Sequence, residues 1–168
     1  MGVSDGVVIV GISPNGNTAR LNLDVFSNIS QYDSIFDRCI CIRDKIMSVN
    51  GIPCHDKGFE EVMELITNSE AKEATIELGR IEGSTVFHYS KGRCIAAKPG
   101  ESYGFLAAKC GVNVAYECRT GNCLTCSRQM EFPDKSNSGK KGNIYQRVIL
   151  NCVGTVPRNY EWLNIFDE

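Results

Sequence analysis

"AYECRTGNCLTC", residues 115–126, places three cysteines four and then two residues apart, and "VILNCVGTV", residues 148–156, supplies a fourth after a gap of 25 residues. The four are Cys118, Cys123, Cys126 and Cys152. Two irons bridged by two sulfides need four thiolates, and C-x4-C-x2-C with a distant fourth cysteine is a known spacing for such [2Fe–2S] clusters. The spacing therefore predicts a [2Fe–2S] site, with three ligands on one loop and the fourth on a later strand.

A structural zinc site is the main alternative for these thiols. Zinc sites more commonly show two C-x2-C pairs, and here only Cys123 and Cys126 form one. The composition of the loop also favours the cluster. Gly121 lets the backbone come close, and a tight loop can aim several N–H groups at an anionic group.

The segments around the cysteines follow one another in a recognisable order. A β-hairpin is predicted over residues 85–90 and 93–98, a short helix over 99–111 and a strand over 147–156. His88, within the hairpin, is expected to be a half-exposed sheet histidine rather than a ligand. The buried face of the helix is expected to carry Tyr103, Leu106, Ala107 and Cys110.

On these motifs, residues 84–157 resemble a plant-type ferredoxin, whose fold is a β-grasp. The resemblance implies one-electron transfer with no bond made or broken in a substrate, and the chain shows no catalytic triad, phosphate loop or acid–base pair of an enzyme. The positions that match the cluster-binding residues of the family are Cys118, Cys123, Cys126, Cys152, Arg119, Gly121 and Thr125.

The charge after the third cysteine departs from the ferredoxin pattern. Soluble photosynthetic carriers of that family are acidic there, whereas residues 127–147 of this chain include Lys135, Lys140, Lys141 and Arg147. Because electrostatic steering sets encounter rates, reversed charge disfavours fast shuttling between basic partners. We therefore expect the cluster to stay docked in a larger membrane redox complex.

The ferredoxin resemblance also implies a compartment. A plastid, with the stroma or the stromal face of the thylakoid as the place, is expected; a mitochondrial matrix or a bacterial cytoplasm is the alternative. A second function is kept beside electron transfer: a structural or assembly subunit, for example of photosystem I, in which the cluster only staples the fold.

The N-terminal half has its own pattern. It predicts strands over 6–13, 44–51 and 73–80 and an amphipathic helix over 58–70. The helix places Phe59, Val62, Met63 and Ile66 on one face, and the last strand points Ala74, Ile76 and Leu78 inward.

Residues 6–80 resemble the later part of a PDZ domain, with "IRDKIMSVNG" and the helix as the matching stretches. Arg43 stands where the family usually has glycine, residues 21–38 are an insertion, and Phe59 opens the helix in place of a histidine. No glycine-rich carboxylate-binding loop precedes residue 6. A scaffold that docks on a partner or on the second half of the chain is therefore favoured over a module that binds peptides by strand addition.

The chain as a whole is expected to be an α+β protein of two small domains, residues 1–82 and 83–168, joined by a linker at 79–84. Residues 1–83 carry seven Lys and Arg against thirteen Asp and Glu, whereas the remainder carries eleven against seven. This opposition favours two modules. The basic half lacks an aromatic-interleaved basic stripe, so nucleic-acid binding is not expected.

Nine cysteines is an odd number, which favours a reducing compartment or a metal site over a disulfide framework. Cys39 and Cys41 are expected to be small buried hydrophobes on a strand. Cys54 and His55 form a conceivable metal pair, but a solvated loop histidine is favoured. Neither a membrane span nor a secretory signal is expected. No role is predicted for Cys94.

Overall fold

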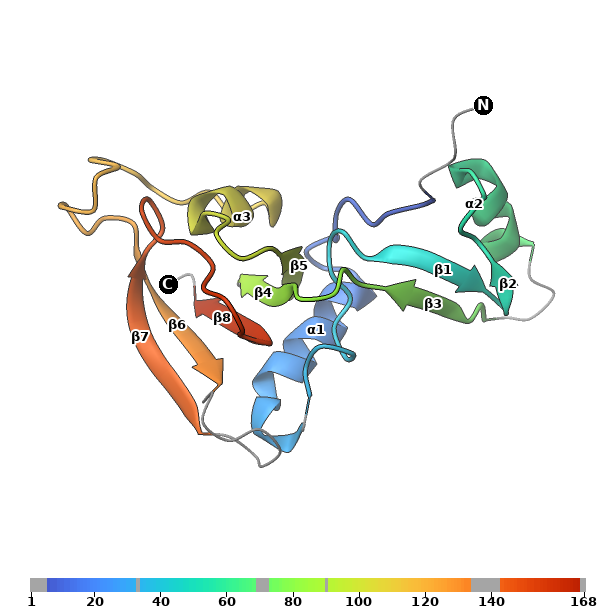
Figure 1. Ribbon diagram of the computed structural model, residues 1–168, viewed down its shortest axis with the longest axis horizontal. Coiled ribbons are helices and arrows are strands. Elements are labelled where there is room, and N and C mark those ends of the chain that lie inside the picture. Colours follow the sequence, from blue (N-terminus) through green and yellow to red (C-terminus); the bar gives the residue numbers. More distant parts are fainter. Residues whose placement is uncertain (1–5, 33, 69–72, 90, 134–142, 167–168) are drawn as a thin grey trace. The chain divides into compact units, whose positions relative to one another are not determined.

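The computed structural model describes residues 6–32, 34–68, 73–89, 91–133 and 143–166. The chain divides into two compact units. Unit 1 is residues 1–10 and 43–81, and unit 2 is residues 11–42 and 82–168. Each contains a sheet and at least one helix, as expected for the α+β class (Figure 1). Residues 11–42, which the sequence placed with the N-terminal domain, belong by their contacts to unit 2.

Unit 1 is a three-stranded antiparallel sheet with one helix. Its elements are β1 (Lys45–Val49), β2 (Ile52–Pro53), α2 (Phe59–Thr67) and β3 (Ile76–Gly79), and the strand order is β2-β1-β3. Asn50 and Gly51 have φ values of 50° and 79° and form the two-residue turn between β1 and β2. This is the backbone that an Asn-Gly pair adopts most easily in a hairpin. The final residues of the predicted helix, 69 and 70, lie outside the described part of the chain.

The core of unit 1 is small. Val49, Cys54 and Val62 are fully buried, but Phe59 of α2 is 66% exposed, and Met63 is also exposed. The predicted amphipathic helix is confirmed as α2, but of its four apolar positions only Val62 is fully buried. The predicted inward side chain of Ile76 is wrong, since 41% of it is exposed.

The predicted strand over residues 6–13 is reduced to an isolated bridge between Val8 and Lys45. The Ile9 N–H donates to the Asp44 carbonyl at 2.8 Å, and the Arg43 N–H donates back to the Ile9 carbonyl at 2.7 Å. Residues 8 and 9 therefore pair with residues 43–45 through a few backbone hydrogen bonds and do not form a regular strand.

A buried ion pair ties the end of β3 back to the start of β1. Arg80 donates from Nε and from its second terminal nitrogen to the two oxygens of Asp44, both at 2.7 Å. Both side chains are buried. Arg80, which the sequence placed in a linker, is thus part of the packed unit, and the boundary between the units falls after Ile81.

Unit 2 contains a five-stranded mixed sheet. Its elements are α1 (Asn17–Ser27), the 3-10 helix η1 (Ile29–Gln31), β4 (Thr85–Tyr89), β5 (Arg93–Ala97), α3 (Tyr103–Lys109), β6 (Ser127–Pro133), β7 (Ile144–Leu150) and β8 (Trp162–Phe166). The strand order is β5-β4-β8-β6-β7, with β4 and β8 parallel and the other neighbours antiparallel.

The predicted hairpin, the short helix and its buried residues are confirmed. Gly111, at φ 71°, follows the helix as its terminator. The predicted strand over 147–156 is wrong in its second half, because β7 ends at Leu150. Two strands were not predicted: β6, within the basic segment, and β8, near the C-terminal end of the sequence.

Helices cover both faces of this sheet. Phe87 and Tyr89 of β4 face the core that contains α3, while Val86, which precedes Phe87, faces the core that contains α1. Every residue of β4 is therefore buried, as in a strand of a sheet covered on both sides. Residues 21–38, expected as an insertion, contain part of the helix that covers the second face.

Two side chains fix α1 on the sheet. Asn22, fully buried, accepts a hydrogen bond from the Ile40 N–H and donates to the carbonyls of Ile40 and Gly92. Phe26 stacks on the ring of His88 with centroids 4.2 Å apart. His88 is consequently 4% exposed, so the expectation of a half-exposed histidine is wrong.

Candidate functional site

The cysteines of interest gather at one end of the β6–β7 hairpin. Cys126 directly precedes β6, and Cys152 lies in a turn just beyond β7, not within a strand as expected. The two strands are paired from Ser127 and Leu150 onward. Residues 110–126 contain no helix or strand. The first three cysteines thus lie on or at the end of a loop, and pairing of the hairpin brings the fourth to them.

Backbone N–H groups of this loop point at sulfur. The N–H groups of Thr120 and Cys123 both donate to Sγ of Cys118 at 3.4 Å. Hydrogen bonds from the Thr120 side chain and from these two N–H groups lower the pKa of the Cys118 thiol to about 5. A thiol that deprotonates this easily is suited to ligate a metal, because the thiolate is the ligand.

Two of the other cysteines, Cys126 and Cys118, affect the thiol of Cys152. A hydrogen bond with the Cys126 thiol is the main cause that raises the pKa of Cys152, and the charge of Cys118 acts in the same direction. The backbone N–H of Gly121 donates to Cys152 and opposes this rise. Proximity of this kind, in which neighbouring thiolates repel one another, is relieved when a cation binds between them.

The four cysteines do not form a closed coordination shell. Among the described residues, no group of three or more His, Cys, Asp or Glu side chains is arranged to hold a metal ion. Cys126 is buried, Cys118 and Cys152 are half-buried, and Cys123 is exposed. The donor set, four thiols with N–H groups aimed at sulfur, has the chemistry that an iron–sulfur cluster requires.

The other residues matched to the ferredoxin family lie in the same loop. Arg119 and Gly121 have φ values of 56° and 84°, so the chain turns sharply there. Gly121 uses this backbone to direct its N–H to Cys152. The Thr125 hydroxyl donates to Oε2 of Glu117 at 2.9 Å, which closes the loop on itself rather than reaching a sulfur.

The loop presents an apolar surface. Leu124, at φ 61°, follows Cys123, and Val153 follows Cys152; both side chains are exposed. Arg147 of the basic segment is exposed as well, and its guanidinium lies 5.4 Å from the Phe132 ring. The three lysines of that segment, Lys135, Lys140 and Lys141, lie outside the described residues.

Sequence reasoning did not single out Asn151, which precedes Cys152. This side chain is buried, and its Nδ2 donates to the Cys126 carbonyl at 3.0 Å. No sequence signal distinguishes such an asparagine, since its role depends on a loop 25 residues away.

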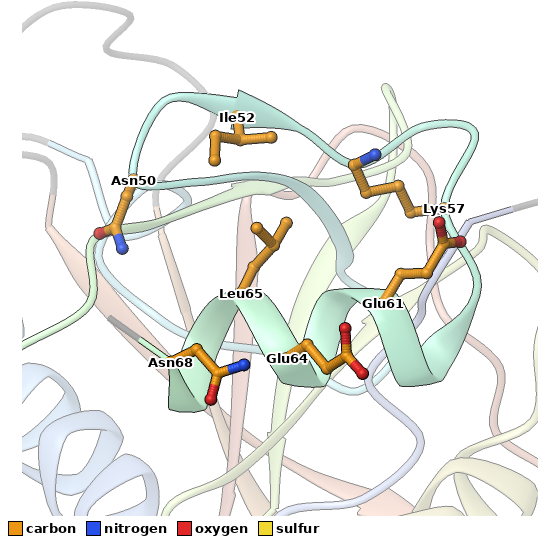
Figure 2. A pocket seen from close by; sticks show the side chains of 7 residues that line it. All are labelled: Asn50, Ile52, Lys57, Glu61, Glu64, Leu65 and Asn68. Carbon is orange, nitrogen blue, oxygen red and sulfur yellow. The ribbon is translucent and has the colours of Figure 1, made fainter. Parts of the chain in front are cut away.

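Unit 1 has a separate shallow groove between the β1–β2 turn and α2. Its volume is about 420 Å³. Figure 2 shows Leu65 rising from α2 toward the strand that carries Ile52, with Glu64 on the helix. The full lining is Asn50, Ile52, Lys57, Glu61, Glu64, Leu65 and Asn68.

Features of this groove argue against a peptide added as a strand. β2 has only two residues, and Pro53, one of them, has no N–H to offer. Oε2 of Glu61 already accepts the Gly58 N–H at 2.9 Å and caps α2. The conceivable metal pair is not formed either, because Cys54 is buried whereas His55 is exposed.

The remaining cysteines are in cores. Cys39 and Cys41 are buried, as expected, but not on a strand. Both contact Cys94 of β5, whose pKa is raised, chiefly by burial and then by these two thiols. Cys110 is buried at the end of α3, as expected. Burial makes these thiols poor nucleophiles.

Among the described residues, no helix is long and apolar enough to cross a membrane. A scan of protein-family models and searches of curated proteins and of solved structures find no match to this chain.

Proposed function

We propose that the chain is a one-electron carrier whose four cysteines, Cys118, Cys123, Cys126 and Cys152, hold a [2Fe–2S] cluster. The observation that carries the proposal is that Cys126 and Cys152 lie at the same end of the β6–β7 hairpin, with backbone N–H groups aimed at the sulfurs of Cys118 and Cys152. When bound, such a cluster supplies one-electron chemistry at a low potential, about −400 mV for the plant-type class.

The sheet of unit 2 supports a plant-type ferredoxin domain with a β-grasp fold. A hairpin, a helix and a last strand inserted parallel to the first strand give the order β5-β4-β8-β6-β7. That order is the one a β-grasp would have, with the thiol loop between α3 and β6.

The chain itself would bind the cluster, shield it on one side and expose it on the other. Cys126 is buried against the core, whereas Cys123 and Leu124 are exposed. A redox centre held this way lies near the surface, where a partner can approach it. The exposed apolar side chains beside it favour a partner that stays bound over one that is steered by charge.

Unit 1 is proposed to be a PDZ-like anchor for a protein partner in a larger redox complex. Its small core and the exposed Phe59 and Met63 support docking on a partner surface. The host is proposed to be a thylakoid complex facing the plastid stroma, with a mitochondrial matrix or bacterial cytoplasm as the alternative.

Iron and sulfide analysis of the purified chain, with EPR after reduction, tests the carrier. We expect two irons and two sulfides per chain and a rhombic signal that appears on addition of one electron. Cys152→Ser should abolish both the bound iron and sulfide and the EPR signal. Cys54→Ala, which removes a thiol of unit 1, should leave both unchanged. Stoichiometric zinc in place of iron, or no visible absorption in the wild type, would refute the proposal.

A structural staple is the second candidate, and one observation favours it. Cys126 and Cys152 flank the paired ends of β6 and β7, so a bound cluster would close that hairpin. Metal binding would then contribute directly to folding. A mediated redox titration separates the two functions: reversible one-electron reduction supports the carrier, and a cluster that cannot be reduced reversibly supports the staple.

A further inference from the structure

Asn151 joins the two cysteine-bearing segments. Its Nδ2 donates to the Cys126 carbonyl at 3.0 Å, and its backbone N–H donates to the same oxygen at 3.2 Å. Nδ2 also lies 3.4 Å from the Tyr89 hydroxyl, and the Asn151 carbonyl accepts the Gly104 N–H at 3.1 Å. One residue thus fastens the turn of Cys152 to Cys126, to β4 and to α3.

The remaining polar atom of this side chain, Oδ1, has no partner in the described part of the chain. Asn151 is 1% exposed, and its Oδ1 finds no hydrogen-bond partner among the described residues. The residue lines a cavity of about 320 Å³ together with Cys152, Arg119 and Tyr116. A buried polar atom without a partner costs free energy, so its retention beside a candidate ligand needs a reason.

We infer that Asn151 is a positioning residue: it sets Cys152 against Cys126 so that the two thiols can ligate the same group. The inference depends on the proposed function for its purpose. Its geometry does not, because both hydrogen bonds from Asn151 to the Cys126 carbonyl are present in the chain without a metal. Two hydrogen bonds from one residue to one carbonyl restrain both translation and rotation of the turn.

As a consequence, Cys126 and Cys152, two of the four proposed ligands, are positioned before a metal binds. Residues that orient metal ligands without touching the metal typically change metal affinity about 10–100-fold when they are replaced. Asn151→Ser removes the hydrogen bond from Nδ2 to the Cys126 carbonyl and leaves the hydrogen bond from the backbone N–H to the same oxygen. It should therefore loosen the two thiols without abolishing either of them.

A second buried asparagine provides a matched control. Asn164 of β8 is also almost fully buried; its Nδ2 donates to Glu131 at 3.1 Å and its Oδ1 lies 2.6 Å from His88 Nδ1. No described hydrogen bond of its side chain reaches a cysteine. Asn164→Ser should lower the stability of unit 2 while leaving the thiols where they are.

The first measurement uses the full-length, metal-free protein. Diamide takes two electrons and two protons from a pair of thiols and leaves a disulfide, and mass spectrometry of peptides follows the Cys126–Cys152 product. We expect Asn151→Ser to slow this reaction about tenfold, by analogy with the cost of misplacing reacting groups. Asn164→Ser should react at the wild-type rate under the same conditions.

The second measurement uses the iron-loaded protein and follows loss of visible absorption in excess chelator. Asn151→Ser should lose iron about 10–100 times faster than the wild type. Asn151→Asp, which keeps the shape but lacks the Nδ2 donor, is measured in parallel, so that a folding failure of one variant leaves the other.

The outcomes separate the inference from the proposed function. If the wild type binds no cluster but Asn151→Ser still slows disulfide formation, the positioning role stands and the proposed function falls. If the wild type binds a cluster and both asparagine variants behave alike in both measurements, the positioning role is overturned and the proposed function stands.

Discussion

His88 should make unit 2 sensitive to acid. Burial lowers its pKa from 6.5 to about 4, and the hydrogen bond with Asn164 opposes this fall only in part. Its Nε2 accepts the Gly92 N–H at 3.1 Å, so a proton on Nε2 would remove an acceptor as well as bury a charge. The folded chain therefore favours the neutral ring.

The sign and size of the effect follow from the two pKa values. The unfolded chain takes up the proton near pH 6.5 and the folded chain only near pH 4, so the folded state loses stability as pH falls between these values. The loss is about 2 kcal/mol between pH 7 and pH 5 and about 3 kcal/mol once the pH is below 4.

Urea unfolding followed by tryptophan fluorescence measures this loss. Trp162 is the single tryptophan of the chain, is buried and lies edge-on to Phe26 in the same core as α1. The wild type is compared with His88→Gln, a neutral side chain, at pH 7, 6 and 5. The variant should be less stable at pH 7 but should lose about 2 kcal/mol less on going to pH 5. If the free energy of unfolding falls equally for the two proteins between pH 7 and pH 5, the assignment of the pH dependence to His88 is refuted.

The remaining predictions concern packing. Arg80→Ala should destabilise unit 1 by about 3–5 kcal/mol, because it leaves Asp44 charged and buried, and hydrogen exchange of the β1 amides should accelerate accordingly; wild-type exchange rates would contradict this. Gly92→Ala should cost about 1–3 kcal/mol beyond the strain of a positive φ, because its Cβ would collide with the Ala19 carbonyl of α1. Gly100→Ala, also at positive φ but with open space around the Cβ, is the control, and equal losses of stability in urea would contradict the role of the collision.

Local patterns predicted part of unit 2 correctly. The hairpin of β4 and β5 and the helix α3 are encoded within a few residues, by alternation, by a Lys-Gly turn and by apolar spacing ended by Gly111. Such signals do not depend on distant partners. The same holds for the turn at Asn50 in unit 1.

Local patterns failed where the partner of a segment is distant in sequence. No strand was predicted where β8 lies, yet β8 is the middle strand of the sheet and pairs with β4 and β6. α1 was taken as an insertion, although its Phe26 packs on β4 and β8 side chains. In unit 1 the apolar face of the helix was predicted correctly from spacing, but the spacing did not show that Phe59 is exposed because no described segment covers it.

For the candidate site, the sequence by itself determined the ligand types and their spacing, and hence the cofactor that the proposal names. It determined too that a glycine and several loop N–H groups accompany the thiols. Only the tertiary structure decided that Cys152 reaches Cys126 from a turn beyond β7, held there by Asn151. The physical reason is that ligand chemistry belongs to single side chains, whereas the distance between two thiols is set by strand pairing and buried hydrogen bonds between segments far apart in the chain.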